Sequence, residues 1–592
     1  MRKINILILF MVLLFFAGCT KDMFSPANDN HSTLQRIYED PNFAEGLLMA
    51  AYNRIPTNSY SFSEVATDDA VTNDKFSTFL QMGTGMWSSQ NNPMEQWKNS
   101  YTAVMYLNKF LVQNPKIDWS YTSTNAKKLY IDMHKGEAYA LRGLFYYYLL
   151  QAHAGYDGSG KLMGVPLDTV DMDINSNFKQ PRNTFDECMQ LIYKDLSRAE
   201  TYLPLDYVDL TNISQVPSKY LGTSMEDYNR VFGAWETQRI SARAVKAIRA
   251  QVALLAASPA FATATSTTTW TNVATYAGDV INLLGFPANI DPNGGVWYTG
   301  TNVDAVSLTT TAIKDQKEML WRGYKQGVAN SLELNAFPPS LYGNGRINPT
   351  QNLVDAFPMA NGYPITDAVN SGYNPATPYA GRDPRLAKYI VYNGATLAST
   401  VISINAGTGA ISGDQVNTLK TSTRTGYYLR KLMREDVKLN PAAQVTKAHY
   451  VPKIRYTEMF LIYAEAANEA WGPDGNGTYT FSARDVIGQI RKRAGITQPD
   501  KYLASITTTA DMRTLIQNER RLELCFEGFR FWDLRRWKAN LTAPAMGVNI
   551  SADNLTFTFG TVENRPYTTN MIYGPLPYQE VLKSNLSQNA GW

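Results

Sequence analysis

Aromatic side chains set among short polar residues are the groups in this sequence best suited to bind a ligand. Flat ring faces stack on the apolar faces of sugars, while Asp, Asn and Arg side chains hydrogen-bond hydroxyl groups. The chain has 36 tyrosines and 11 tryptophans. Rings of this kind also fill cores and helix seams, and we expect most of them to do so here. The candidates are therefore the rings that lie in polar, turn-rich segments.

Eight residues in such segments are candidates for ligand contact. Trp87 in GMWSSQNNP is the first choice, with a core position at the base of the loop as the alternative. Trp297 and Tyr298 lie between glycines in GGVWYTGTN, so at least one ring faces outward if this segment is extended. For Arg382 in GRDPRL the alternative is an ion pair with a buried acid. The other four candidates are Asp69 in TDDAVTND, Asn91 beside Trp87, Trp321 in EMLWRGYKQG and Tyr342 in PSLYGNGR.

Motifs for catalysis, metal binding and phosphate binding are absent or incomplete. The sequence has no HExxH, G-x-S-x-G or CxxC motif, and its four histidines are scattered. GYDGSGK has the spacing of a phosphate loop, but Leu162 follows where a Ser or Thr would bind magnesium. Asp474 opens a calcium-like run with a misplaced glycine. We expect no cofactor and no metal, although a glycosidase carboxylate pair rarely shows in sequence.

The segment 519–537, ERRLELCFEGFRFWDLRRW, combines nine charges with large apolar side chains. Helical spacing puts Leu515, Leu522, Phe526 and Phe529 on one face, and acids recur every four residues beside arginines. This pattern predicts a half-buried helix held by an ion-pair network. A catalytic carboxylate cluster is the alternative, but an acid paired with arginine stays ionised and is a poor general acid.

The elements that must position these residues are mainly helices, which makes the expected fold predominantly α. Periodicity predicts helices over 127–152, 184–202, 239–257, 271–284, 456–471, 481–493 and 512–538. Small residues at helical spacing allow close packing in three helix pairs, 137–203, 242–284 and 457–493, similar to tetratricopeptide repeats. Loop-rich insertions lie between them at 57–97, 205–238, 286–350 and 366–425, with a hairpin suggested within 396–424.

Three single residues have predictable surroundings. Trp97 repeats with Tyr101 and Val104 at helical spacing, so we expect it in the core. Cys188 and Cys525 lie in helical, apolar contexts, which favours two buried thiols over a disulfide.

The formal net charge is +3, and +1 without residues 1–18. A nearly neutral chain lacks the basic surface that nucleic-acid binding requires.

The N-terminus has the pattern of an export signal. A basic start is followed by an apolar stretch too short to span a membrane and by Phe16-Ala17-Gly18-Cys19. Small residues before a cysteine resemble the cleavage site of bacterial lipoproteins. We therefore expect a signal peptide at 1–18, a lipidated Cys19, a flexible tether over 19–33 and one helical domain at 34–592. An ordinary signal peptide with a free Cys19 is the alternative.

Five further segments resemble one family when they are taken together and in order. They are GEAYALRGLFYYYLLQAHAGYDG at 136–158, PTQNLVDAFPMANGYPI at 349–365, GRDPRL at 381–386, RYTEMFLIYAEAANEA at 455–470 and IRKRAG at 490–495. With the segment 519–537 they resemble the SusD-like (RagB/SusD) outer-membrane glycan-binding lipoproteins. The ending SQNAGW departs from the family's usual QNPGY at Ala590 and Trp592.

The resemblance implies a SusD-like fold with tetratricopeptide-like helix pairs as a scaffold and loop insertions with small β elements. It also implies a cell-surface lipoprotein, anchored in the outer membrane and facing the exterior, that binds a glycan without cleaving it. The expected partner is a SusC-like TonB-dependent transporter barrel, to which the glycan is delivered. A peptide-capturing lid of a related transporter and a surface glycoside hydrolase are the alternatives.

Overall fold

The computed structural model describes residues 40–592 except 57–61, 121–122, 173–174, 309–312 and 407–412. The expected signal peptide, the lipidated Cys19 and the tether lie outside the described residues. Within the described part of the chain, no helix is both long and apolar enough to span a membrane.

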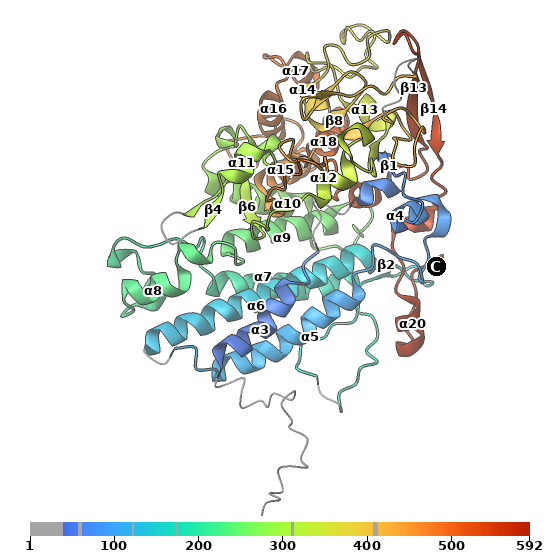
Figure 1. The fold of residues 1–592 in the computed structure, drawn as a ribbon. Helices are drawn as coiled ribbons and strands as arrows, with labels where there is room; N and C mark the ends of the chain where they lie inside the picture. Colours follow the sequence, from blue (N-terminus) through green and yellow to red (C-terminus); the bar gives the residue numbers. More distant parts are fainter. Residues whose placement is uncertain (1–39, 57–61, 121–122, 173–174, 309–312, 407–412) are drawn as a thin grey trace, which may run out of the picture.

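Long helices packed side by side form one half of the molecule (Figure 1). Each helix packs on the next along the series α3, α5, α6, α7, α9, α10 and α15, and α15 also packs on α16 and α18. The predicted pairs α6–α7, α9–α10 and α15–α16 therefore stack into a continuous scaffold, as expected for a predominantly α fold. The bounds are α3 Pro41–Tyr52, α5 Trp97–Gln113, α6 Thr124–His153, α7 Phe185–Tyr202, α8 Met225–Phe232, α9 Ala242–Ala257, α10 Trp270–Leu284, α15 Tyr456–Trp471, α16 Ala483–Ala494 and α18 Thr509–Glu523.

Local capping explains why these helices begin where the sequence predicts. Thr184, Thr269 and Ser482 each accept a hydrogen bond from the backbone three residues on and form complete capping boxes. Helix α9 begins at Ala242, three residues after the predicted start, because Ser241 supplies the cap. Its small side chains are buried against the neighbouring helices, which lets the helix axes approach closely.

The predicted helix 512–538 is wrong in one respect, because the chain breaks it in two. Helix α18 ends at Glu523, and α19 (Arg530–Arg536) begins after a tight turn. Phe526 and Gly528 have φ of 62° and 82° in that turn, which an α-helix does not allow. The backbone N–H of Gly528 donates to Glu64 Oε1 at 2.8 Å, so a residue from the start of the chain holds the turn.

Loops, short helices and two-stranded sheets form the other half, into which α15, α16 and α18 also extend (Figure 1). β1 (Ala70–Val71) pairs with β7 (Asn348–Pro349), and β6 (Met319–Arg322) pairs with β12 (Pro452–Arg455), both antiparallel. The other pairs are β2 Gly155–Tyr156 with β3 Leu162–Met163, β4 Ser307–Leu308 with β5 Ile313–Lys314, β8 Ile390–Val391 with β11 Tyr428–Leu429, β9 Thr396–Leu397 with β10 Thr400–Val401 and β13 Ala545–Ile550 with β14 Phe557–Glu563. The short helices are α4 Thr78–Gln81, α11 Gly300–Asp304, α12 Ser331–Ala336, α13 Gln351–Ala356, α14 Pro384–Tyr389, α17 Lys501–Ser505 and α20 Tyr578–Ser584.

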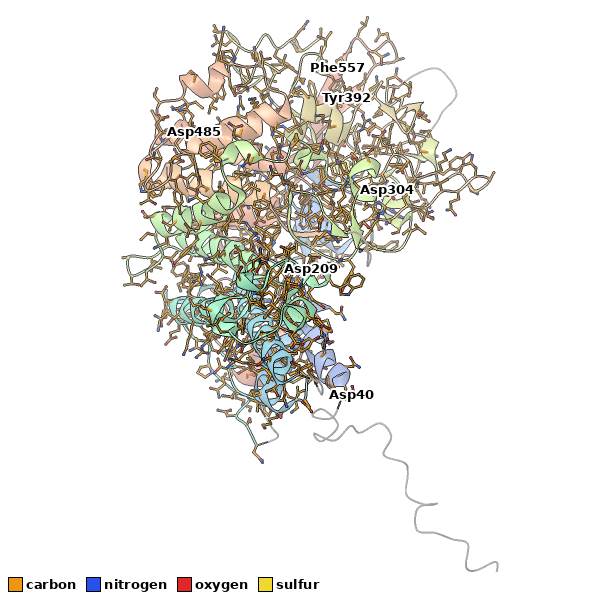
Figure 2. All side chains as sticks on the ribbon, turned by 90° about the vertical axis from the view of Figure 1, so that its left-hand side faces the viewer. Asp40, Asp209, Asp304, Tyr392, Asp485 and Phe557 are labelled. Atoms are coloured by element: carbon orange, nitrogen blue, oxygen red, sulfur yellow. The ribbon has the colours of Figure 1, made fainter. Side chains whose placement is uncertain are left out.

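The two halves have separate hydrophobic cores. The larger core joins the long helices and contains Trp97, as predicted. A second core lies under the loops, and a small third cluster surrounds Trp87. Cys188 and Cys525 are buried, unpaired thiols in different cores, as expected. In Figure 2, Asp40, where the described chain begins, lies at the helical end, while Tyr392 and Phe557 lie at the opposite end.

Candidate functional site

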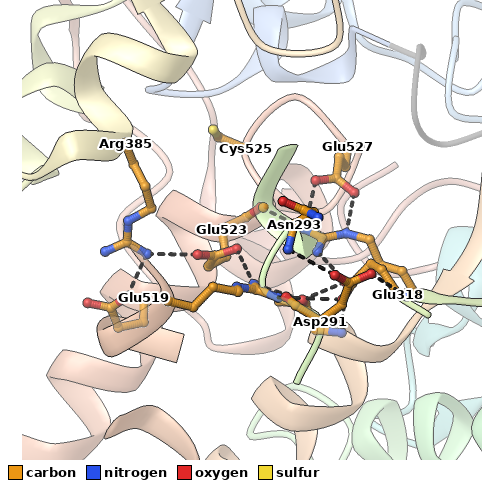
Figure 3. A network of polar contacts seen from close by, with 12 residues as sticks. Asp291, Asn293, Glu318, Arg385, Glu519, Glu523, Cys525 and Glu527 are labelled. Atoms are coloured by element: carbon orange, nitrogen blue, oxygen red, sulfur yellow. Dashed lines mark hydrogen bonds and ion pairs between the residues drawn. The ribbon is translucent and has the colours of Figure 1, made fainter. Parts of the chain in front are cut away.

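The acids of 519–527 form a buried ion-pair network, as the sequence predicts. The partners, however, come from other elements and not from neighbouring turns of the same helix. Glu519 is bound by Arg385 and Arg491 at 2.8 and 2.7 Å. Arg385 also reaches Glu523 at 3.1 Å, so it lies between two carboxylates (Figure 3). Because each acid is paired and buried, this network positions surrounding elements and offers no exposed general acid.

Two arginines of the same region clamp the early loop to the scaffold. Arg521 Nε donates to Asp69 Oδ1 at 2.7 Å, and Arg530 Nη2 donates to Asp68 Oδ2 at 2.8 Å. Asp69 is completely buried. Its expected role as a ligand contact is therefore corrected: the carboxylate neutralises arginines inside the protein and holds strand β1, which begins at Ala70, in place.

Trp87, the first choice from the sequence, is a core residue. Only 5% of its surface is exposed. Its ring meets Phe531, Tyr567 and Trp592 edge-on at centroid distances of 5.8, 6.2 and 4.8 Å, and its Nε1 donates to Asn92 Oδ1. No ring face is left for a sugar, so the core alternative is correct. The Asn91 amide donates to the carbonyl of Met86 and fixes the adjacent turn.

Trp297 and Tyr298 both point inward, contrary to the expectation for an extended segment. The segment instead forms a 3-10 turn over Gly294–Val296 and then helix α11. Trp297 is 1% exposed and packs on Tyr450 at a centroid distance of 5.6 Å. The Tyr298 hydroxyl donates to the carbonyl of Lys388 at 3.3 Å. Trp297 is enclosed, whereas Tyr298 is 4% exposed and contributes to the lining of an open groove of about 840 Å³.

Trp321 and Arg382 are also structural. Trp321 lies on β6, as the alternation predicts, but its ring is buried and its Nε1 donates to the carbonyl of Gln238 at 3.0 Å. The guanidinium of Arg382 donates to the carbonyls of Pro378, Val354 and Phe357. Arg382 is thus bound by backbone carbonyls, so it is neither a free sugar contact nor the partner of a buried acid, which was the alternative prediction.

The structure brings together a different set of residues at the edge of the loop half. Residues of 72–80 and 417–424, together with Glu563, line a cavity of about 540 Å³. Asn73 fixes its floor, because its Nδ2 lies 3.0 Å from the Asn344 carbonyl, 2.9 Å from that of Gly345 and 3.1 Å from that of Ser422. Three loops far apart in sequence therefore meet at one side chain. We call this cavity, with Phe76 and Tyr342 on its bordering loops, the loop site.

Two exposed aromatic rings lie on loops that border the cavity, although neither ring lines it. Phe76 is 87% exposed, and its backbone N–H donates to Asp74 Oδ1, which closes the turn that precedes helix α4. Tyr342 is 55% exposed and has a left-handed backbone with φ of 63°. A single exposed ring is common on protein surfaces, so what makes these two candidates is their place on the loops that border a cavity. Of the eight sequence candidates, Tyr342 keeps its proposed role here.

Phe76 is not identified as a candidate from the sequence, although the neighbouring segment 67–74 is considered. The polar run TDDAVTND at 67–74 ends two residues before it. A lone phenylalanine between Asp74 and the helix-capping Ser77, with no helical or strand periodicity around it, is the signal that could have found it. The participation of Asn417, Leu419 and Lys420 has no such signal, because it depends on a loop that meets 72–80 only in three dimensions.

Comparison with known proteins agrees with this architecture. A family model described as "SusD family" matches residues 314–592, and another described as "Starch-binding associating with outer membrane" matches residues 28–220. The SusD-like protein P38 of Formosa agariphila is 22% identical over 566 residues, 92% of this chain and 93% of that protein.

Two solved structures from Bacteroides fragilis share the fold. A SusD-like protein has 23% identity and a TM-score of 0.70, with 96% of this chain and 100% of that chain covered. A SusD-like carbohydrate-binding protein has 21% identity and a TM-score of 0.67, with 92% and 98% covered. The two family models together match most of the sequence, and this chain belongs to the SusD-like family.

Proposed function

We propose that this protein is a cell-surface lipoprotein that binds an oligosaccharide or polysaccharide at the loop site and does not cleave it. The observation that carries the proposal is the pair of exposed rings, Phe76 and Tyr342, on ordered loops beside a polar cavity of about 540 Å³. Ring faces for stacking and side-chain amides for hydroxyl groups are the two elements that sugar binding needs. A related SusD-like structure is that of a carbohydrate-binding protein, which supports the same ligand class.

The arrangement of acids supports a non-catalytic role. Burial raises the pKa of Glu64, Glu137 and Glu458 to about 7, the range in which a general acid works. All three carboxyls are nevertheless buried, and Glu458 borders an internal cavity of only about 50 Å³, too small for a sugar ring. Glu563, the acid that lines the loop site, is held by Arg424 and Arg565.

Delivery of the bound glycan to a SusC-like TonB-dependent barrel is the finer part of the proposal. It is supported by family membership, by the description of one family model as associating with the outer membrane and by the lipoprotein pattern that ends at Cys19. Affinity purification from solubilised outer membrane should recover such a barrel with the wild-type protein. The Cys19→Ala variant should instead be released from the membrane fraction.

The binding step is tested with Phe76→Ala/Tyr342→Ala against a polysaccharide panel by affinity electrophoresis and calorimetry. Each stacking ring contributes roughly 0.5–1.5 kcal/mol, so the double variant should lose about 1–3 kcal/mol of affinity. Trp235→Ala removes a ring about as exposed as that of Tyr342 from the turn after helix α8, which does not line the cavity, and should bind normally. Unchanged binding in the double variant would place the ligand elsewhere. New reducing ends, or binding to peptides and to no glycan, would contradict the proposal.

A further inference from the structure

The loop site carries more positive charge than its own acids neutralise. Lys75 and Lys420 line the cavity and are exposed, and within the described residues neither makes an ion pair. The two arginines there are already engaged. Arg424 binds Glu563 at 2.7 Å, and Arg346, on the Tyr342 loop, lies 3.8 Å from Asp74.

The acids nearby leave the two lysines uncompensated. Asp74 faces Arg346 and caps its own turn through the backbone N–H of Phe76. Glu563 is shared between Arg424 and Arg565. Asp414 is buried and accepts from the backbone N–H of Ser340, so it faces the loop and not the cavity. The cavity therefore presents two ammonium groups and no free carboxylate.

This charge pattern separates the loop site from a larger open groove. That groove, of about 850 Å³ beside helix α20, is lined by two lysines, Lys98 and Lys583, and by two glutamates, Glu95 and Glu580, so its charges balance. A neutral sugar is recognised by amides, carboxylates and rings and gains little from two free ammonium groups. Flexible lysines that donate to anionic oxygen are instead suited to carboxylate and sulfate groups, and they speed the approach of a polyanion.

We propose that the loop site takes an anionic glycan, with Lys75 and Lys420 binding its carboxylate or sulfate groups while Phe76 and Tyr342 stack on its sugar rings. This inference rests on the proposed function and adds the chemical class of the ligand. The two lysines come from separate loops of the cavity, so the site offers two ammonium groups to the anionic groups of one chain. A charged polysaccharide fits this arrangement better than a single charged sugar.

The test measures the affinity of the full-length protein and of Lys75→Ala/Lys420→Ala for three polysaccharides. Alginate carries carboxylates, carrageenan carries sulfates, and laminarin is neutral. Wild-type protein should bind at least one of the charged polymers more tightly than laminarin. Each exposed ion pair corresponds to about a 1.5- to 5-fold change in affinity, so the double variant should bind about 2- to 25-fold more weakly. Carboxyl-reduced alginate and desulfated carrageenan identify which anion is recognised, because only the matching treatment weakens binding to the level of the double variant.

Salt and control variants make the test specific. Raising salt from about 0.1 to 1 M shortens the Debye length from roughly 10 to 3 Å and should weaken wild-type binding more than binding by the double variant. Lys128→Ala/Lys492→Ala removes the same charge from exposed helical positions and should bind as wild type. Exposed lysines should not affect folding, which an unchanged melting temperature verifies.

Three outcomes overturn the inference in distinguishable ways. If laminarin binds best, and only Phe76→Ala/Tyr342→Ala lowers the affinity, the glycan-binding function holds and the anionic class is wrong. If no polysaccharide binds to the wild-type protein, the proposed function fails and the inference fails with it. Equal affinity of the wild-type protein and Lys75→Ala/Lys420→Ala for a charged polymer also refutes the role of the lysines.

Discussion

Removing the charge of Glu523 should destabilise the protein in a pH-dependent manner. Its carboxylate is buried and is bound by Arg493 at 2.9 Å and by Arg385 at 3.1 Å. Burial alone raises the pKa of this group, but Arg493, Arg385 and nearby cations outweigh it and hold the pKa at about 2 instead of 4.5. A pKa lowered from 4.5 to about 2 corresponds to roughly 3 kcal/mol of folding free energy.

The sign follows from linkage. A depressed folded-state pKa stabilises the protein above the unfolded-state value of 4.5, and this contribution is lost as pH falls toward about 2. Glu523→Gln should therefore lower the free energy of unfolding by about 3 kcal/mol near neutral pH, in the range expected when one partner of a buried pair is removed. The deficit relative to wild type should shrink to about 1 kcal/mol or less toward pH 2, because both proteins then carry a neutral side chain.

Urea unfolding followed by circular dichroism near neutral pH and in acid measures both differences. Glu226→Gln is the matched control, since its side chain is 84% exposed and makes one ion pair, with Arg230 on the same helix. That change should cost at most about 0.5 kcal/mol. If Glu523→Gln were as stable as the control, or if its deficit were the same at both pH values, the network would not be the source of the stability.

Three further outcomes test other parts of the structure. Trp87→Ala should lower the free energy of unfolding by about 3–5 kcal/mol, as for other buried aromatics. At a temperature where the variant is folded, its glycan affinity should equal that of the wild type. Lost affinity in the folded variant would show that Trp87 contacts the ligand. Glu458→Gln should stabilise the protein by up to about 3 kcal/mol above pH 7. Burial raises the pKa of Glu458 from 4.5 to about 7, so ionising this carboxyl in the folded protein costs stability as the pH rises through that range. An unchanged urea midpoint would contradict this. Cys188 and Cys525 should react with a thiol reagent only after unfolding, because burial raises the pKa of both thiols to about 12; rapid labelling of the native protein would show otherwise.

The scaffold was predictable because its signals are local. Capping residues such as Thr184 and Ser482 and the helical repeat around Trp97 each act within a few residues of sequence. The break between α18 and α19 also has a local sign, since Gly528 can adopt the positive φ that ends a helix. Phe526 in the same turn gives no such sign, because its positive φ is imposed by the packing of its fully buried ring.

The candidate site was less predictable because exposure of a loop residue is decided by distant segments. Trp87 lies in a polar, glycine-containing loop, yet Phe531, Tyr567 and Trp592 cover it from positions more than 400 residues later. The prediction that Trp297 or Tyr298 faces outward was wrong for a different reason. Adjacent aromatics alternate outward only in an extended strand, and the glycines before them allow a 3-10 turn instead. Tyr342 remains a candidate because its own ring stays 55% exposed, although distant residues such as Asn73 contact its loop.

The buried network and the loop site are connected through the early loop. Arg521 and Arg530 hold Asp68 and Asp69 inside the scaffold, and Asn73, four residues after Asp69, fixes the floor of the loop site. An extended chain advances only about 3.3 Å per residue, so fixing one end of this segment restricts where Asn73 and Phe76 can lie. A binding surface made of loops keeps its affinity only if those loops are ordered before the ligand arrives. We therefore expect α18 and α19 to affect binding at the proposed loop site indirectly, by holding the loop that carries Phe76 in place.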